Sequence, residues 1–90
     1  MNLTEKITIP STVFVQKVDD EMVLLDMNSE NYFGLDTIGT VMWHYLSETH
    51  SLAKMLSSML EEYDVEEDVL RKDITTFVQD LEKNALIQIG

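Results

Sequence analysis

The side chains that could bind a metal or act as nucleophiles are few in this chain and unfavourably spaced. Cysteine is absent, and the two histidines, His44 and His50, are six positions apart with no further ligand at a metal-binding spacing. Ser51 follows His50 directly, but adjacent side chains of one chain do not form a catalytic triad. We therefore expect surface histidines, no bound metal and no serine nucleophile.

The densest group of carboxylates is the run DVEED at residues 64–68. A calcium-binding loop needs alternating oxygen ligands around a central glycine, and this run contains no glycine. Asp64 with Glu67 three positions later instead resembles a capping box, which predicts the start of a helix. The three glycines of the chain are isolated, so there is no glycine-rich phosphate-binding loop. These patterns predict a protein that is not an enzyme and needs no cofactor.

Length and charge narrow the class of protein further. Ninety residues with 44% hydrophobic content are enough for a single domain, residues 1–90, with one core. The formal net charge of −11 repels duplex nucleic acid and anionic lipid. No apolar run approaches the roughly 18 residues of a membrane span, and the N-terminus lacks the pattern of a signal peptide. Together with the absence of cysteine, which suits a reducing compartment, this predicts a cytoplasmic protein that binds neither nucleic acid nor membrane.

The first part of the chain has the composition of β-strands. Its apolar runs are rich in Val, Leu and aromatic residues, and they are separated by short polar turns, DDE and NSEN. Short strands with tight connections form an antiparallel meander. We expect an irregular lead-in over residues 1–11, followed by strands at residues 12–18, 22–27 and 32–35.

After Asp36 the apolar residues recur at steps of three and four, which predicts helices. The first helix carries Ile38 on its apolar face, with Trp43 beside that face, and the third ends at Asn84. The segment ALIQI then closes the chain over the core. We expect helices over residues 37–48, from about residue 51, and over 65–84. The fold class is therefore α+β, a winged helix-turn-helix in which a three-stranded antiparallel sheet precedes three helices.

A winged helix-turn-helix raises the question of DNA binding, for which the third helix would enter the major groove. Residues 64–84 contain seven acids and three bases, which is the wrong sign for a nucleic-acid surface. We expect no DNA binding.

Residues spread over the chain resemble the signature of the PqqD-like family, whose members are also called RiPP recognition elements. That signature joins LLD and YF.LD..G..IW to a helix that starts with serine, a YDV motif and a last helix with D, F and L. The resemblance spans residues 12–87, with departures at Met42 and at Asn84-Ala85-Leu86. The matching residues are Leu24, Leu25, Asp26, Tyr32, Phe33, Leu35, Asp36, Gly39, Trp43, Ser51, Tyr63, Asp64, Val65, Asp73, Phe77 and Leu81.

The resemblance implies a non-catalytic binding module. Family members hold the leader segment of a ribosomally made precursor peptide and deliver it to tailoring enzymes. The leader adds as an extra strand to the third strand and lies in the cleft between that strand and the third helix. A freestanding domain of this size is similar to those of lasso-peptide gene clusters, in which a separate leader peptidase is the partner. The alternative within the family is the pyrroloquinoline quinone pathway, in which the partner is a radical SAM enzyme.

The stretch NYFGL independently has the character of an edge strand that is kept free for a guest. Unpaired N–H and C=O groups of such an edge are a template for another chain. A helix that starts directly after it, with Asp36 or Thr37 as N-cap, holds this edge in place. Gly34 lets a guest backbone pass close by, and Gly39 lets the helix pack close to the sheet. The candidate peptide-binding residues here are Asn31, Tyr32, Phe33, Gly34 and Leu35.

The third helix has two flanks beside its core stripe. One carries Val69, Asp73, Thr76 and Asp80 with Phe77 at its border, and the other carries Arg71, Thr75 and Glu82. Val69 is apolar yet displaced from the core stripe, which suits the wall of a groove. We predict that Val69, Asp73, Thr76, Phe77 and Asp80 face the third strand and the bound peptide. The helical wheel leaves open that the Arg71 flank faces it instead.

Two other interpretations remain. In the first, the strand at residues 32–35 is an ordinary core strand whose edge is covered by the chain's own tail. In the second, the protein is a degenerate winged-helix interaction domain that dimerises through the edge of its sheet.

Overall fold

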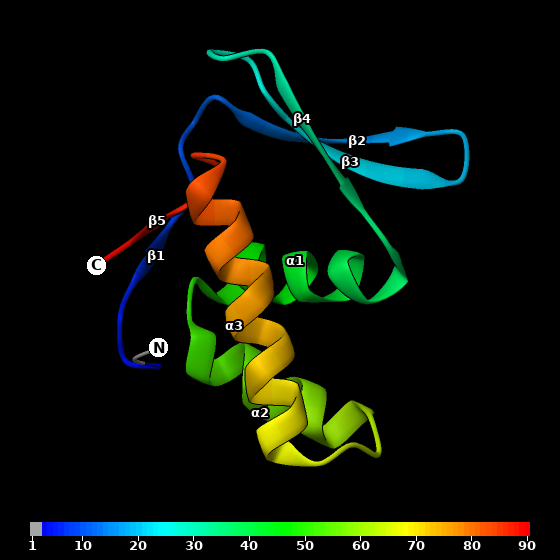
Figure 1. Cartoon of the computed structure of the whole chain (residues 1–90), viewed down its shortest axis with the longest axis vertical. Helices are drawn as coiled ribbons and strands as arrows, with labels where there is room; N and C mark the ends of the chain where they lie inside the picture. Colours follow the sequence, from blue (N-terminus) through cyan, green and yellow to red (C-terminus); the bar gives the residue numbers. More distant parts are fainter. Residues whose placement is uncertain (1–2) are drawn as a thin grey trace.

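The computed structural model describes residues 3–90, in which a three-stranded sheet lies beside three helices (Figure 1). The α+β class and the order of a meander followed by three helices are confirmed. The first two residues of the expected lead-in lie outside the described residues. The sheet contains β2 (Val13–Val18), β3 (Glu21–Asp26) and β4 (Asn31–Leu35), and the helices are α1 (Thr37–Thr49), α2 (Leu52–Glu62) and α3 (Glu67–Lys83).

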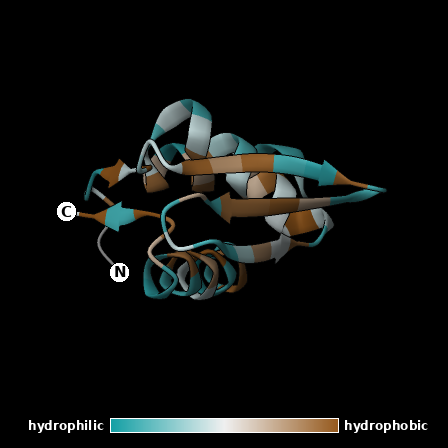
Figure 2. Ribbon diagram, turned by 90° about the horizontal axis from the view of Figure 1, so that it is seen from above, coloured by the Kyte–Doolittle hydropathy of each residue, from teal (hydrophilic) through white to brown (hydrophobic). Residues whose placement is uncertain are grey.

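The register of the sheet decides which side chains meet the helices. The strands pair antiparallel in the order β2-β3-β4, and Leu24 lies opposite both Val15 and Phe33. Because directly opposed residues share a face, the buried Leu24 places Phe33 on the side of the core. Tyr32, one position earlier, lies on the other face and is 70% exposed. Seen from above in Figure 2, β4 is the strand of this sheet nearest to α3.

The helices bury apolar stripes against each other and against the sheet. The buried side chains recur at steps of three and four, as the sequence predicts, and Trp43 is only 6% exposed. Ile38 departs from its predicted core position, because it is 42% exposed in the first turn of α1. Within residues 3–90, no helix has the length and apolar character needed to cross a bilayer. The core stripes are Met42, Trp43 and Leu46 of α1, Leu52, Met55, Leu56 and Met59 of α2, and Leu70, Ile74, Val78 and Leu81 of α3.

A second, two-stranded sheet was not predicted. It joins β1 (Ile7–Thr8) to β5 (Gln88–Ile89), with Ile7 opposite Ile89. The tail covers the core as expected, since Leu86 and Ile87 are buried there. However, the tail pairs with β1 and not with β4. The interpretation in which the tail covers the edge of β4 is therefore wrong.

The start of α3 also differs from the prediction. The helix begins at Glu67 and its N-cap is Glu66, whose side chain makes no capping hydrogen bond. Asp64 lies in a segment without regular secondary structure, residues 64–66, that connects the end of α2 to α3. The predicted capping box at Asp64 therefore does not form, because Asp64 precedes the N-cap Glu66 by two residues. Asn84 is the C-cap, as predicted.

Candidate functional site

The outer edge of β4 is open. This strand pairs with β3 on one side, from Asn31 opposite Asp26 to Leu35 opposite Met22. On its other side, no strand among residues 3–90 pairs with it. Backbone donors and acceptors on that side are available to an added strand.

A buried carboxylate holds the turn that leads into β4. Asp26 is only 5% exposed, and its two oxygens accept hydrogen bonds from the Asn28 N–H at 3.1 Å and the Ser29 hydroxyl at 2.8 Å. These bonds, led by the one from Ser29 and joined by one from the Thr12 side chain, hold the pKa of Asp26 below its ordinary value. The hydrogen bonds of Asp26 thereby close the β3–β4 turn and connect it to Thr12, the residue before β2.

A second carboxylate holds the other end of the strand. Asp36 is the N-cap of α1, and its Oδ1 accepts a hydrogen bond of 2.6 Å from the Gly39 N–H. The Asp36 carbonyl accepts from the Thr40 N–H at 2.9 Å and from the Thr40 hydroxyl at 2.8 Å. Of the two residues predicted as cap, Asp36 is the one that serves. Because Asp36 alone separates β4 from α1, the open edge cannot shift without disturbing the helix start.

A groove of about 560 Å³ lies between β4, the first turns of α1 and the middle of α3. Phe33, Gly34 and Leu35 line it from β4. From the junction and α1 it is lined by Asp36, Ile38, Gly39 and Met42, and from α3 by Asp73, Thr76, Phe77 and Asp80. The open strand edge and the groove thus belong to one continuous surface.

Two aromatic rings join the strand to the helix in this groove. The rings of Phe33 and Phe77 meet edge to face, with centroids 6.5 Å apart and planes inclined by 70°. Gly39 makes room for this pair, because a Cβ at that position would stand 3.4 Å from Cε1 of Phe77. The close approach to the sheet that the sequence predicted for Gly39 is present, since the same Cβ would stand 3.6 Å from Cδ2 of Leu35, and Phe77 of α3 takes part in it as well. At Gly34 a Cβ would meet nothing within 4 Å, so the space beside it is open.

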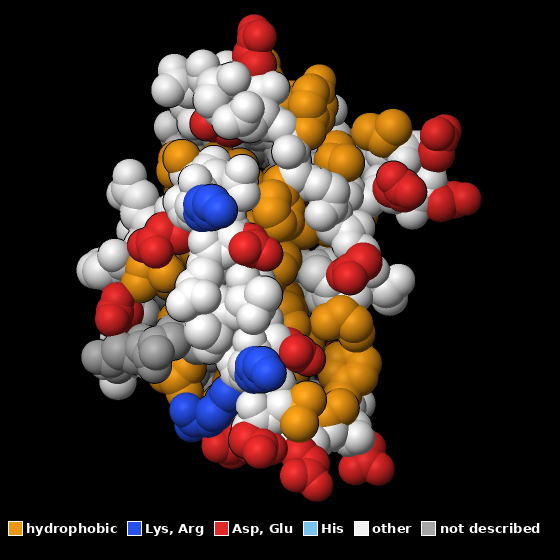
Figure 3. All heavy atoms as spheres, viewed as in Figure 1, with side chains coloured by type: hydrophobic (Ala, Val, Ile, Leu, Met, Phe, Trp, Pro, Cys, Tyr) orange, Lys and Arg blue, Asp and Glu red, His pale blue; other side chains and the backbone are white. Residues whose placement is uncertain are grey.

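The rim of the groove is acidic. Its charged lining residues are Asp36, Asp73 and Asp80, and no lysine or arginine is among them. Figure 3 shows hydrophobic side chains exposed in a strip beside α3, with acidic side chains around it. The groove therefore suits a guest that brings an apolar side chain and positive charge.

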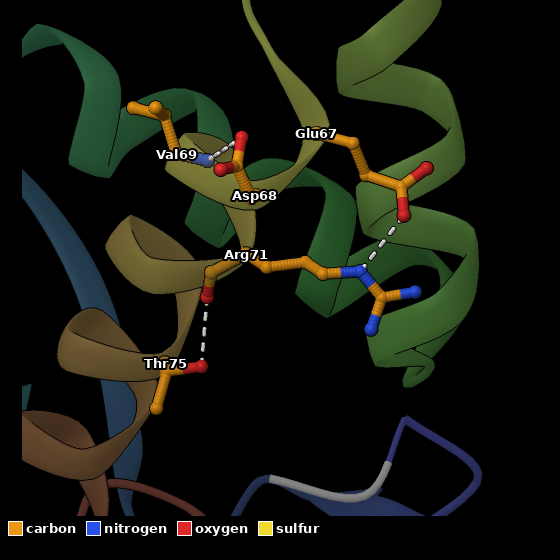
Figure 4. A network of polar contacts seen from close by, with 5 residues as sticks. All are labelled: Glu67, Asp68, Val69, Arg71 and Thr75. Atoms are coloured by element: carbon orange, nitrogen blue, oxygen red, sulfur yellow. Dashed lines mark hydrogen bonds and ion pairs between the residues drawn. The ribbon is translucent and has the colours of Figure 1, made fainter.

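The flank of α3 that faces β4 is the one that contains Asp73, Thr76 and Asp80. Arg71 lies on the other flank, where its Nε forms an ion pair of 3.0 Å with Glu67 one turn earlier. Figure 4 shows the side chains of Val69 and Arg71 pointing in opposite directions. The alternative in which the Arg71 flank lines the groove is therefore wrong.

Most of the predicted site residues come together, and three do not line the groove. Tyr32 is on the opposite face of the sheet, Asn31 lies at the start of β4, and Val69 is 53% exposed one turn before Asp73. The groove is also lined by Ile38 and Met42. Met42 belongs to the core, as the sequence predicts, whereas Ile38 is exposed. Ile38 stands at the end of an apolar stripe, and a helical wheel alone does not distinguish such a groove residue from a core residue.

Two solved structures are similar to this chain. One is described as "TbiB1 in Complex with the TbiA(beta) Leader Peptide"; it has a TM-score of 0.81 and 30% identity, over 90% of this chain and 94% of that one. The other is described as "Lasso peptide synthetase B1 complexed with the leader peptide"; it has a TM-score of 0.80 and 28% identity, over 92% of this chain and 98% of that one. No curated protein sequence matches the chain significantly.

The family comparison covers most of the sequence. The profile described as "Coenzyme PQQ synthesis protein D (PqqD)" matches residues 21–87, which include the whole of β3, β4 and the three helices. These residues also contain the open edge, both carboxylates that hold it and the entire groove lining. The resemblance inferred from the sequence motifs is thus confirmed, and the chain belongs to the PqqD family.

Proposed function

We propose that this protein binds the leader segment of a ribosomally made precursor peptide and catalyses no reaction itself. The leader adds as a strand to the outer edge of β4 and lies in the groove beside α3. The observation that carries the proposal is an unpaired strand edge that runs along an open, partly apolar groove. In strand addition, main-chain hydrogen bonds supply affinity, and contacts to alternate side chains supply specificity.

Each part of the groove has a role in this proposal. Phe33, Ile38, Met42 and Phe77 provide apolar contacts for an inward-facing side chain of the leader. Gly34 leaves space beside the strand for the leader backbone. The proposed peptide-binding residues are Asn31, Tyr32, Phe33, Gly34, Leu35, Val69, Asp73, Thr76, Phe77 and Asp80, with Ile38 and Met42 in addition.

The bound leader is presented to a processing enzyme in the cytoplasm, where the precursor is made. The reducing conditions there suit a chain that has no cysteine and therefore needs no disulfide. We favour a lasso-peptide leader peptidase as this enzyme. The similarity to a chain described as a lasso peptide synthetase B1 with bound leader supports this choice.

A second candidate is a role in pyrroloquinoline quinone synthesis, with a radical SAM enzyme as partner. The description of the matching family favours it. The two candidates differ in the enzyme that the domain binds, so mixtures with each enzyme type, separated by size, distinguish them.

The substitution Thr76→Trp tests where the leader binds. Thr76 is exposed on α3 and lines the groove, so a tryptophan there fills the space beside β4 without entering the core. We expect the TbiA(beta) leader peptide, titrated by calorimetry, to bind the variant at least about tenfold more weakly than the parent. Thermal unfolding should change little, because off-core substitutions usually cost less than about 0.5 kcal/mol.

Gln79→Trp is the matched control. Gln79 is also exposed on α3, but it does not line the groove, so this variant should bind like the parent. Equal binding by Thr76→Trp and the parent places the site elsewhere. A parent domain that binds neither this leader nor any peptide selected from a random library contradicts the proposed function as a whole.

A further inference from the structure

The groove carries carboxylates on its α3 side, which strand addition through backbone hydrogen bonds does not by itself require. Asp73 and Asp80 line its α3 side, and no ion pair with either is found among residues 3–90. Both side chains are exposed on the rim. The third acid of the lining, Asp36, is already engaged as N-cap of α1 through its Oδ1. Asp73 and Asp80 are thus the two carboxylates of the groove that are free to meet a charge on the guest.

The position of Asp80 is unfavourable in the free domain. It lies three residues before the end of α3 at Lys83, where the helix dipole disfavours negative charge. A side chain that opposes a local rule without a compensating contact in its own fold is often one that serves binding. Asp80 gains such a contact only if a cation approaches from the groove.

The spacing of the two acids matches an extended chain. Asp73 and Asp80 are seven residues apart, which is two helical turns, or about 10.5 Å along α3. Side chains on one face of a strand recur about every 6.6 Å, so positions i and i+4 lie about 13 Å apart. Flexible lysine or arginine side chains can accommodate the small difference between these lengths. The residue halfway between them, i+2, then faces Phe33, Ile38 and Phe77.

We propose that the guest of this groove carries the pattern basic–x–apolar–x–basic on the segment that pairs with β4. This inference rests on the proposed function and adds the substrate class to it. The central apolar side chain contacts the Phe33–Phe77 pair, and the two cations meet Asp73 and Asp80. Because the pattern is symmetrical, it holds for either direction of the guest strand.

The test is a selection of displayed random peptides on four forms of the domain. These are the parent, Asp73→Asn/Asp80→Asn, Asp19→Asn/Asp64→Asn and Thr76→Trp. The second double variant is a matched control, since it removes the same charge at exposed sites outside the groove lining. Asparagine also tolerates the positive φ of 57° at position 19.

We expect the parent and the matched control to enrich peptides with a basic residue two positions on either side of an apolar one. The Asp73→Asn/Asp80→Asn variant should keep the apolar preference and lose the basic one. A peptide selected on the parent, titrated by calorimetry, should bind this variant about three- to tenfold more weakly, as is usual for two exposed ion pairs. The matched control should bind it like the parent.

Three outcomes count against the inference in distinguishable ways. If basic residues are enriched equally on the Asp73→Asn/Asp80→Asn variant, overall charge attracts them and the proposed pattern is wrong. If apolar residues are enriched without basic ones, the pattern is again wrong, while the groove still binds peptides. If the parent and Thr76→Trp enrich the same peptides, the guest binds outside this groove, and the proposed site fails together with the inference.

Discussion

At the scale of single residues, Gly39 connects the helix start to the groove. A Cβ on this residue would stand 3.0 Å from Oδ1 of Asp36, 3.4 Å from Cε1 of Phe77 and 3.6 Å from Cδ2 of Leu35. The Asp36 oxygen cannot easily retreat, because it accepts the capping hydrogen bond from the Gly39 N–H itself. Gly39 therefore serves the N-cap and the Phe33–Phe77 contact at the same time.

Substitutions at Gly39 should separate helix propensity from crowding. Gly39→Ala should change the free energy of unfolding by less than about 1 kcal/mol, since a propensity gain of about that size opposes the tight contacts. Gly39→Val should destabilise the domain by about 1–3 kcal/mol, because its methyl groups must displace Asp36 or Phe77. Denaturant unfolding measures both values. Ala53→Val, at an exposed position of α2, gives the cost of valine in a helix without crowding. A Gly39→Val variant as stable as the parent contradicts this account of the junction.

At the scale of elements, β4 is held by a carboxylate at each end. Asp26 fixes the turn before it and Asp36 starts the helix after it. The strand itself contributes one paired edge and one open edge. Rigid ends keep the open edge extended in the absence of a guest, so less conformational entropy is lost when a guest strand adds to it.

The turn before β4 should make stability depend on pH. The pKa of Asp26 is lower in the folded protein than the unfolded value of about 3.9, so its ionised form stabilises the fold. This contribution is complete above the unfolded pKa and is lost as the pH falls through the folded pKa. Asp26→Asn should therefore be less stable than the parent near neutral pH, and the difference should shrink below about pH 4. Thermal unfolding of both proteins over a pH series measures this, and a difference that is constant down to about pH 2 contradicts it.

At the scale of the whole molecule, the sequence predicts those elements that are long enough to show a helical period or the composition of a strand. The stripes of α1, α2 and α3 recur with a helical period, the apolar runs of β2, β3 and β4 have the composition of strands, and all of these elements form. The strands β1 and β5 contain two residues each and pair across nearly the whole chain, so no local pattern reveals them. The start of α3 was misplaced because a capping pattern in the sequence does not show where the connection from α2 ends.

The sequence likewise predicts only part of the groove. The helical wheel separates the two flanks of α3 and identifies Asp73, Thr76 and Asp80, but it does not show which flank faces β4. It also assigns Ile38 to the core, because the wheel does not show that the neighbouring elements leave the first turn of α1 uncovered. Contacts between elements distant in sequence decide both questions.

The most direct test of the account is amide hydrogen exchange along β4 with and without a bound peptide. A peptide selected on the parent domain, at a concentration that saturates it, should slow exchange in residues 31–35, because a strand added to the open edge ties up backbone N–H groups there. Residues 14–17 of β2, at the opposite edge of the same sheet, should exchange as before. If the peptide binds tightly by calorimetry while exchange in residues 31–35 stays unchanged, strand addition to β4 is contradicted.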